Sequence, residues 1–242
     1  MRIGILGGGQ LGKMLAQAAR TLPLAVEIAI YDASPSACAR TESDSFTVGS
    51  FCDAQAIEQF ASEVDIVTYE FENIDPDIVD SLSNAVQGSQ ALRTLRNRLL
   101  EKQFINTLPG VQCVPYTLVE EEQPLAYPFI VKPVSLGYDG KGQRVIKNDA
   151  DLRFVSPGMV AEHYLQEVTE YSMVIARSIT GEFVSYPVFE NDHIHQILDS
   201  TRFAEIDKKL QERMHSKAIV IAEALDYYGT LTVEFFLSQG TL

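Results

Sequence analysis

The sequence predicts an α/β protein in two parts: a Rossmann-like first domain over residues 1–90 and a second domain over residues 91–242 in which antiparallel strands dominate. Short apolar runs alternate with helical patterns in the first part, which predicts a parallel sheet with helices on its faces. In the second part, strand patterns separated by turns prevail. The change between these patterns places the domain boundary near residue 90.

The first domain alternates strands and helices in a regular order. Strands are expected over residues 2–6, 26–31 and 64–69. Apolar residues recur at helical spacing between Leu11 and Ala19, after the first strand. Asp53 and Asp75 are expected to begin two further helices, because aspartate accepts hydrogen bonds from the free amides of a first turn. Pro76 supports the second start, since proline lacks the amide that would go unpaired there.

The second domain begins with a predicted helix over residues 90–105 and contains a longer one over residues 207–225. The Thr180-Gly181-Glu182 turn predicts a hairpin. The expected strands are 127–133, 143–147, 158–165, 171–179, 183–189 and 229–237.

The charge balance excludes some classes of partner. The chain has 242 residues, with 19 basic and 33 acidic side chains and a formal net charge of −14. This argues against a nucleic-acid-binding face and against an anionic membrane surface as the main partner. A small anionic substrate stays compatible, because backbone amides and one or two lysines suffice to hold a phosphate.

Cysteine usage and hydropathy indicate a cytoplasmic protein. Cys38, Cys52 and Cys113 are widely spaced and predict neither a disulfide framework nor a zinc site. The N-terminal sequence turns glycine-rich too early for a signal peptide. No apolar run approaches the length that spans a bilayer. We therefore expect a protein of a reducing compartment.

A glycine-rich turn follows the first strand. Residues 7–12 fit the pattern G-x-G-x-x-G, and Asp32 lies 20 residues beyond Gly12. In a dinucleotide site such amides are open to an anion and such a carboxylate binds ribose hydroxyls. The same turn also occurs wherever a strand reverses tightly into a helix. Ligand contact is the favoured interpretation, but a nicotinamide cofactor is not, since no hydride-transfer domain follows.

Two further stretches carry polar groups at strand ends. Residues 68–73 place two carboxylates and an amide after a strand, where substrates of open sheets gather. A solvated loop is the favoured interpretation of these residues alone. Lys132 lies in an apolar strand and precedes a glycine-rich loop over residues 137–143. A buried ammonium needs an anionic partner, and glycine-rich amides can cover phosphates. Phosphate binding is favoured here over an ordinary hairpin turn.

The remaining candidates are single charges. Glu234 lies in an apolar strand and should share a face with Thr232 and Phe236, so it is either solvent-facing or paired, with magnesium as a natural partner. Glu162, Glu170 and residues 190–193 are more often solvated strand ends than ligands. The histidines lack the spacing of a structural zinc site.

Together these stretches resemble the N5-carboxyaminoimidazole ribonucleotide synthetase family, the ATP-grasp carboxylases of purine biosynthesis. The resemblance rests on residues 7–14, 68–73, 96–102, 137–143, 190–193 and 233–236, in matching order and spacing. It implies a Rossmann-like pre-ATP-grasp domain followed by an incomplete α+β ATP-grasp domain. It also implies a homodimer that acts on small molecules, with neither nucleic acid nor membrane as a partner.

The reaction that the resemblance implies uses ATP, Mg²⁺ and bicarbonate to carboxylate the exocyclic amine of 5-aminoimidazole ribonucleotide through carboxyphosphate. A glycine-rich lid suits this chemistry, because carboxyphosphate is labile in water. Metal and lysine charges would neutralise the phosphoryl group in transfer.

The resemblance also assigns roles to residues. Arg98 and Lys132 would hold ATP phosphates, Glu170 would bind ribose, and His193 would contact the nucleotide. The lid over the phosphates would consist of Gly137, Tyr138, Asp139, Gly140, Lys141, Gly142 and Gln143, in which Asp139 and Lys141 are the catalytic candidates. The hinge around adenine would be Glu162, His163, Tyr164 and Leu165. The ribonucleotide would face Gly9, Gln10, Leu11 and Glu70, and Glu234 would bind magnesium.

The sequence departs from the family pattern in three places. Pro133, Ser135 and Leu136 replace residues that are more often arginine and glycine, and residues 198–203 lack the usual ending. Family members also continue beyond the position of Leu242 into a second magnesium ligand, so a truncated chain with very low activity alone is expected. The alternatives are another ATP-grasp carboxylate–amine ligase, a NAD-dependent oxidoreductase or a non-catalytic nucleotide-binding module.

Overall fold

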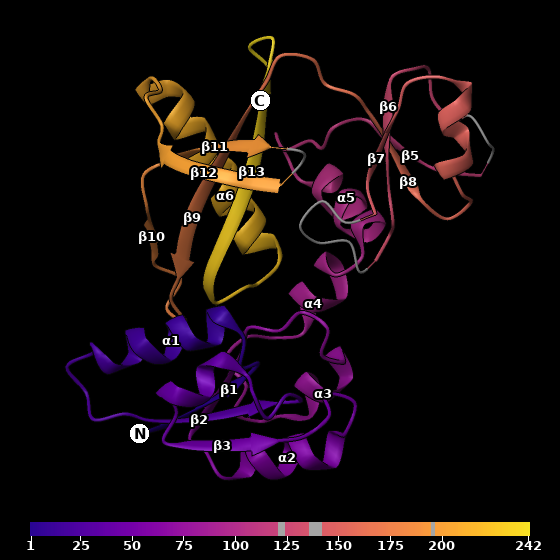
Figure 1. The fold of residues 1–242 in the computed structure, drawn as a ribbon. Coiled ribbons are helices and arrows are strands. Elements are labelled where there is room, and N and C mark those ends of the chain that lie inside the picture. Colours follow the sequence, from indigo (N-terminus) through magenta and orange to yellow (C-terminus); the bar gives the residue numbers. More distant parts are fainter. Residues whose placement is uncertain (121–123, 136–141, 195–196) are drawn as a thin grey trace. The chain divides into compact units, whose positions relative to one another are not determined.

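The computed structural model describes residues 1–120, 124–135, 142–194 and 197–242. The described chain divides into two compact units, Met1–Arg93 and Thr94–Leu242. Helix α4 (Gln90–Leu95) contains the point of division. Figure 1 shows the elements of both units.

The first unit is a parallel sheet with strands in the order β3-β2-β1-β4. Its strands are β1 (Arg2–Leu6), β2 (Glu27–Asp32), β3 (Ser45–Val48) and β4 (Ile66–Tyr69). Its helices are α1 (Gln10–Arg20), α2 (Ala54–Ser62), α3 (Pro76–Ser81) and a 3-10 helix over Cys38–Glu42. Parallel strands need crossover connections, and the intervening helices supply them. The predicted Rossmann-like fold is confirmed.

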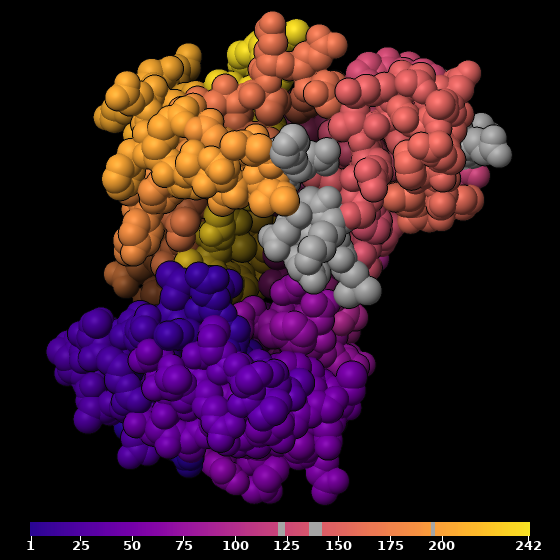
Figure 2. Space-filling model, in the orientation of Figure 1, coloured from indigo at the N-terminus to yellow at the C-terminus, as the bar shows by residue number. Residues whose placement is uncertain are grey.

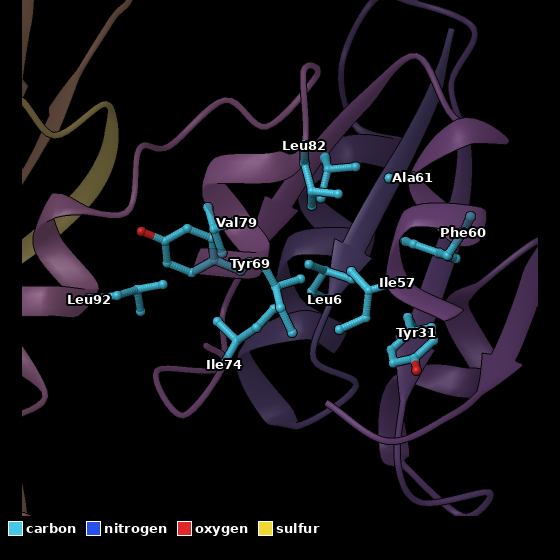
Figure 3. Packing of buried hydrophobic residues seen from close by; sticks show 13 residues of the cluster. Leu6, Tyr31, Ile57, Phe60, Ala61, Tyr69, Ile74, Val79, Leu82 and Leu92 are labelled. Atoms are coloured by element: carbon cyan, nitrogen blue, oxygen red, sulfur yellow. The ribbon is translucent and has the colours of Figure 1, made fainter. Parts of the chain in front are cut away.

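Both faces of this sheet are covered, because side chains alternate along each strand. On one face, Leu6 and Tyr31 pack against Ile57 and Phe60 of α2, as Figure 3 shows. On the other face, Ile5 belongs to a second cluster with Ala16 of α1. β1, central in the sheet, is therefore buried from both sides.

The apolar stripe predicted for α1 is not the side that the helix buries. Leu11, Met14 and Leu15 are exposed, whereas Gly12 and Ala16 are buried. The helix begins so close to the preceding turn that a Cβ atom on Gly12 would lie 2.3 Å from the backbone oxygen of Gly7. Small residues therefore face the sheet here, and the larger apolar ones point outward.

The second unit contains two antiparallel sheets. The smaller sheet has the strand order β5-β8-β6-β7. The larger sheet has the order β10-β9-β11-β12, and β13 pairs with β9 as well. The smaller sheet comprises β5 (Tyr116–Leu118), β6 (Phe129–Lys132), β7 (Arg144–Ile146) and β8 (Val160–His163). The larger comprises β9 (Val168–Arg177), β10 (Phe183–Ser185), β11 (Phe189–Ile194), β12 (Ile197–Phe203) and β13 (Gly229–Ser238). The helices are α5 (Arg98–Thr107), a 3-10 helix over Asp149–Phe154, and α6 (Lys208–Ala224).

Helix α6 covers one face of the larger sheet. Met214 and Ala218 of α6 pack against Met173 of β9 and Phe235 of β13. The opposite face of β9 and β13 is mixed: Ser172, Thr232 and Glu234 lie there beside Val174 and Phe236, as the alternation along the strands requires. At the edge of this sheet, β12 is exposed along its whole length and forms part of the outer surface in Figure 2.

The structure differs from the predicted elements in a few places. The helix predicted over residues 90–105 is two helices, α4 and α5, because the Asn97 side chain accepts the amides of Leu99 and Leu100 and starts a new helix. The strand predicted over residues 183–189 ends early as β10. Strands β3, β5, β11 and β12 were not predicted. In the described part of the chain, none of the helices has the length and apolarity needed to cross a bilayer.

Candidate functional site

The glycine-rich turn of the first unit is held by two carboxylates from neighbouring strands. Asp32, at the end of β2, accepts the Gly8 amide at 2.7 Å. Glu70, just after β4, accepts the Gly9 amide at 2.9 Å. Both strands flank β1 in the sheet, so their ends reach the turn. The expectation that these amides are open to an anion is therefore wrong, because the protein's own carboxylates already bind them.

The Glu70 carboxylate also explains the glycine at position 7. Gly7 has a φ of +115°, and a Cβ atom there would lie 2.6 Å from Glu70 Oε1. Burial raises the pKa of Glu70; the charges of Asp32 and Glu72 add to this effect, and the hydrogen bond from Gly9 opposes it. A dinucleotide pyrophosphate would meet negative charge at this turn.

The predicted substrate residues lie together in the first unit. Gly9 is half-buried and bonded to Glu70, and Gln10 and Leu11 follow as exposed residues in the first turn of α1. A polar amide and an apolar side chain are thus accessible to solvent next to the half-buried Glu70 carboxylate in this unit.

The predicted phosphate-binding residues of the second unit border a cavity of about 620 Å³. Arg98, Lys132, Glu162, Leu165 and Glu234 line it, together with Glu101, Lys102 and Cys113. Cavities of this size hold small ligands in proteins. Residues from α5, both sheets and the chain between them therefore meet at one site.

Strand register explains why Lys132 and Glu162 meet. Glu162 of β8 lies opposite Ile130 of β6 and opposite Tyr116 of β5. Directly opposite residues share a face, and Lys132 shares it because it is two residues from Ile130. Lys132 Nζ donates to Glu162 Oε2 at 2.7 Å.

Glu162 also faces a second lysine, which the sequence reasoning missed. Lys102 Nζ of α5 lies 3.0 Å from Glu162 Oε1, an ion pair without well-directed hydrogen-bond geometry. Burial favours the neutral acid, but the charges of Lys132 and Lys102 outweigh it and lower the pKa of Glu162. Lys102 lies four residues after Arg98, one helical turn away, and this spacing could have pointed to it.

Arg98 holds the chain that leads into the predicted lid. Its backbone amide donates to Val134 at 2.8 Å, and its guanidinium donates to the Pro133 carbonyl. Gly142 has a φ of +80°, which favours glycine, and packs against Pro133; the neighbouring Gln143 is half-buried. The lid residues Gly137, Tyr138, Asp139, Gly140 and Lys141 lie outside the described residues.

Glu234 lies on the face of the larger sheet that is opposite α6. It is exposed and opposite Ser172, while Phe236, two residues on, is opposite Glu170. His193 Nδ1 lies 3.2 Å from Glu170 Oε2 on the same face. Burial and the charge of Glu234 raise the pKa of Glu170, although His193 and Lys132 act in the opposite direction. The charges of Glu170, Glu234 and Lys132 thus act on one another.

Two of the predicted hinge residues lie apart from the cavity lining. His163 and Tyr164 are exposed, and the His163 amide donates to the Pro115 carbonyl at 3.0 Å. Glu170 and His193 also lie outside the cavity lining. Over the described ranges, no three histidine, cysteine or acidic side chains gather as a metal-binding cluster.

Comparisons with known proteins match both units. Residues 1–95 match the ribonucleotide synthetase preATP-grasp domain, and residues 110–242 match the ATP-grasp domain. The N5-carboxyaminoimidazole ribonucleotide synthase of Staphylococcus aureus (strain COL) is 36% identical, over 98% of this chain and 67% of the relative. The Staphylococcus haemolyticus enzyme of the same name is 34% identical over the same shares.

Solved structures agree with these matches. The Staphylococcus aureus N5-carboxyaminoimidazole synthetase complexed with ADP superposes with a TM-score of 0.91 at 35% identity, covering 100% of this chain and 68% of that one. An Aspergillus clavatus carboxyaminoimidazole ribonucleotide synthase complexed with ATP gives a TM-score of 0.84 at 26% identity, covering 100% of this chain and 67% of that one. The chain spans about two thirds of these relatives. It belongs to the N5-carboxyaminoimidazole ribonucleotide synthase family of ATP-grasp ligases.

Proposed function

We propose that this chain binds ATP in the cavity of its second unit and uses it to carboxylate 5-aminoimidazole ribonucleotide in purine biosynthesis. The single observation that carries the proposal is the meeting of Arg98, Lys132, Glu162 and Glu234 around one cavity. Two cations there can face phosphate oxygens, and charge-assisted hydrogen bonds to phosphate are strong.

The nucleoside end of ATP is assigned to the strands beside this cavity. The proposed adenine hinge comprises the last two residues of β8, Glu162 and His163, and the two residues after them, Tyr164 and Leu165. Glu170 would accept from ribose hydroxyls, and His193, 3.2 Å from Glu170, would hold that carboxylate in place and contact the nucleotide.

Glu234 is the proposed protein ligand of magnesium. Magnesium is commonly bound through one or two carboxylates together with phosphate oxygens and water, so one exposed glutamate beside the phosphate-facing cations fits it. Burial and the charge of Glu234 raise the pKa of Glu170, so a cation held by Glu234 would offset part of that negative charge. Bound magnesium would neutralise charge on the transferring phosphoryl group.

The aminoimidazole ribonucleotide is assigned to the first unit, at Gly9, Gln10, Leu11 and Glu70. Gln10 offers both a donor and an acceptor to a heterocycle, and Leu11 offers apolar surface. Glu70, which already accepts the Gly9 amide, would contact the ribonucleotide from the end of β4. Asp139 is proposed to take up the proton of the reacting amine, with Lys141 two residues further along the chain as the neighbouring charge.

The proposed reaction has two steps. A bicarbonate oxygen attacks the γ-phosphorus of ATP, and ADP leaves, which gives carboxyphosphate. The exocyclic amine then attacks its carbonyl carbon, inorganic phosphate leaves, and the nitrogen loses a proton. Lys132 and Arg98 stabilise the charge of the first step, since phosphoryl transfer depends mainly on positioning and electrostatics.

Calorimetry tests the proposed ligands. Titration of the chain with MgATP, 5-aminoimidazole ribonucleotide and NADH should show binding of the first two only. Tight NADH binding without ATP binding would favour an oxidoreductase instead. A phosphate-release panel of amine substrates distinguishes the ribonucleotide from the substrates of other ATP-grasp carboxylate–amine ligases. We also propose that the protein is cytoplasmic and forms a homodimer. Analytical ultracentrifugation would test the homodimer.

A further inference from the structure

We propose that Lys102 is a positioning residue that sets how much of the charge of Lys132 is available to nucleotide phosphates. The proposal rests on the proposed ATP site. Lys102 and Lys132 face opposite oxygens of one carboxylate, at 3.0 Å from Glu162 Oε1 and 2.7 Å from Glu162 Oε2. The three side chains form a charge triad with a net charge of +1 when all are ionised.

The two lysines of this charge triad are held differently. Lys102 is 9% exposed, and its ammonium lies 5.3 Å from the centre of the Tyr116 ring, a cation–π contact that fixes it over the sheet. Tyr116 is directly opposite Glu162, so the ring and the carboxylate contact the Lys102 ammonium together. Lys132 is half-buried at the end of β6 and is therefore the lysine that can turn toward a ligand.

Without Lys102, Glu162 would have Lys132 as its partner in the charge triad. A buried carboxylate is costly to leave unpaired, so Lys132 would remain bound to it. An incoming phosphate would then have to separate a buried ion pair. With Lys102 present, the carboxylate keeps a partner when Lys132 moves toward phosphate. Lys102 thus acts on the ligand through Glu162 and needs no contact with the ligand itself.

Other charged groups around Lys102 do not replace Glu162. Glu101 and Arg98 lie on the same helix and line the same cavity. Among the described residues, the ion pairs of Lys102 and Lys132 are with Glu162 and not with Glu101. Burial raises the pKa of Glu101, and the charge of Lys102 opposes that effect. The Cys113 thiol contacts the backbone oxygen of Lys102, and burial raises its pKa, so it contributes no charge at neutral pH. Glu162 is thus the anion through which Lys102 acts on Lys132.

The test compares binding of adenosine with binding of MgADP, measured by calorimetry on this chain. The dissociation constant of adenosine divided by that of MgADP reports how much the phosphates contribute to binding. Effects of a substitution on the adenine contacts cancel in this ratio. K102M should reduce this ratio about tenfold, as expected when a charge-assisted hydrogen bond is withheld, and leave adenosine binding unchanged. K102R should keep the ratio, and so should K147M, which alters an exposed lysine outside the cavity.

The double variant K102M/E162Q separates positioning from a merely structural role. Replacing Glu162 with glutamine releases Lys132, so the ratio should return toward that of the unaltered chain. An unchanged ratio in K102M, equal losses for both ligands, or no recovery in the double variant would overturn the proposal. If K102M does not fold, K102Q takes its place with the same expectations. Failure of the unaltered chain to bind MgADP would instead contradict the proposed ATP site.

Discussion

Glu162 keeps its negative charge in a buried position because two ammonium groups face its two oxygens. It is 3% exposed, and its pKa lies below the ordinary value despite the opposing effect of burial. A depressed carboxyl pKa means that the folded state favours the ionised form. The charge triad of Lys102, Glu162 and Lys132 therefore stabilises the fold only while Glu162 is ionised.

Glu162→Gln should lower the free energy of unfolding at pH 7 by about 3 kcal/mol, because it leaves two buried ammonium groups without their anion. The contribution of Glu162 is fully present above its unfolded pKa of about 4.3 and is lost as the pH falls through the lower folded value. The difference between the two proteins should therefore shrink below about pH 4.3. Urea unfolding followed by circular dichroism between pH 7 and pH 3.5 measures it.

The matched control is Glu205→Gln, which changes an exposed glutamate of the same unit. This control should unfold like the unaltered chain at every pH. A constant difference between Glu162→Gln and the unaltered chain down to pH 3.5 would contradict the assignment of the stabilisation to the ionised carboxylate.

Helix starts were largely predictable at the scale of single elements. Asp53 and Asp75 cap α2 and α3 as expected, because a short acceptor side chain before an apolar pattern is a strong local signal. The start of α5 was not predicted. Leu92, Leu95 and Leu99 keep helical spacing across the break at Asn97, and spacing alone does not show where a cap interrupts a helix.

Asn97→Ala should destabilise the second unit by about 1 kcal/mol, because the amides of Leu99 and Leu100 lose their acceptor. Asn97→Asp keeps an acceptor and should stay close to the unaltered stability. Thermal unfolding followed by circular dichroism provides the comparison. Equal losses in both variants would show that the side-chain oxygen does not cap α5.

Gly12→Ala should destabilise the first unit by at least about 2 kcal/mol, since the new Cβ atom would lie 2.3 Å from the Gly7 carbonyl oxygen. It should also weaken ribonucleotide binding by displacing the turn that carries Gly9. Gly88→Ala is the control, because no atom lies within 4 Å of its Cβ position. Denaturant unfolding measures the stability of both variants, and calorimetry measures their ribonucleotide binding. Equal stability of Gly12→Ala and Gly88→Ala would contradict tight packing at Gly12.

At the scale of the molecule, the alternation of strands and helices was sufficient to predict a Rossmann-like first part and an antiparallel second part. The sites were predictable only in part. Lys132 and Glu234 were recognised because each is a charge in an apolar strand. The ion pair of Lys102 with Glu162 depends on which helix and strand become neighbours, and so do the hydrogen bonds that Gly8 and Gly9 donate to carboxylates. Sequence spacing does not contain that information.

The most direct test of the central claim, that the cavity of the second unit binds ATP through Lys132, is a calorimetric titration with MgATP of three proteins. The unaltered chain and Lys147→Met should bind with the same affinity. Lys132→Met should bind about 30-fold more weakly, which corresponds to about 2 kcal/mol for a lost charge-assisted hydrogen bond. Equal affinity of Lys132→Met and the unaltered chain would contradict the claim.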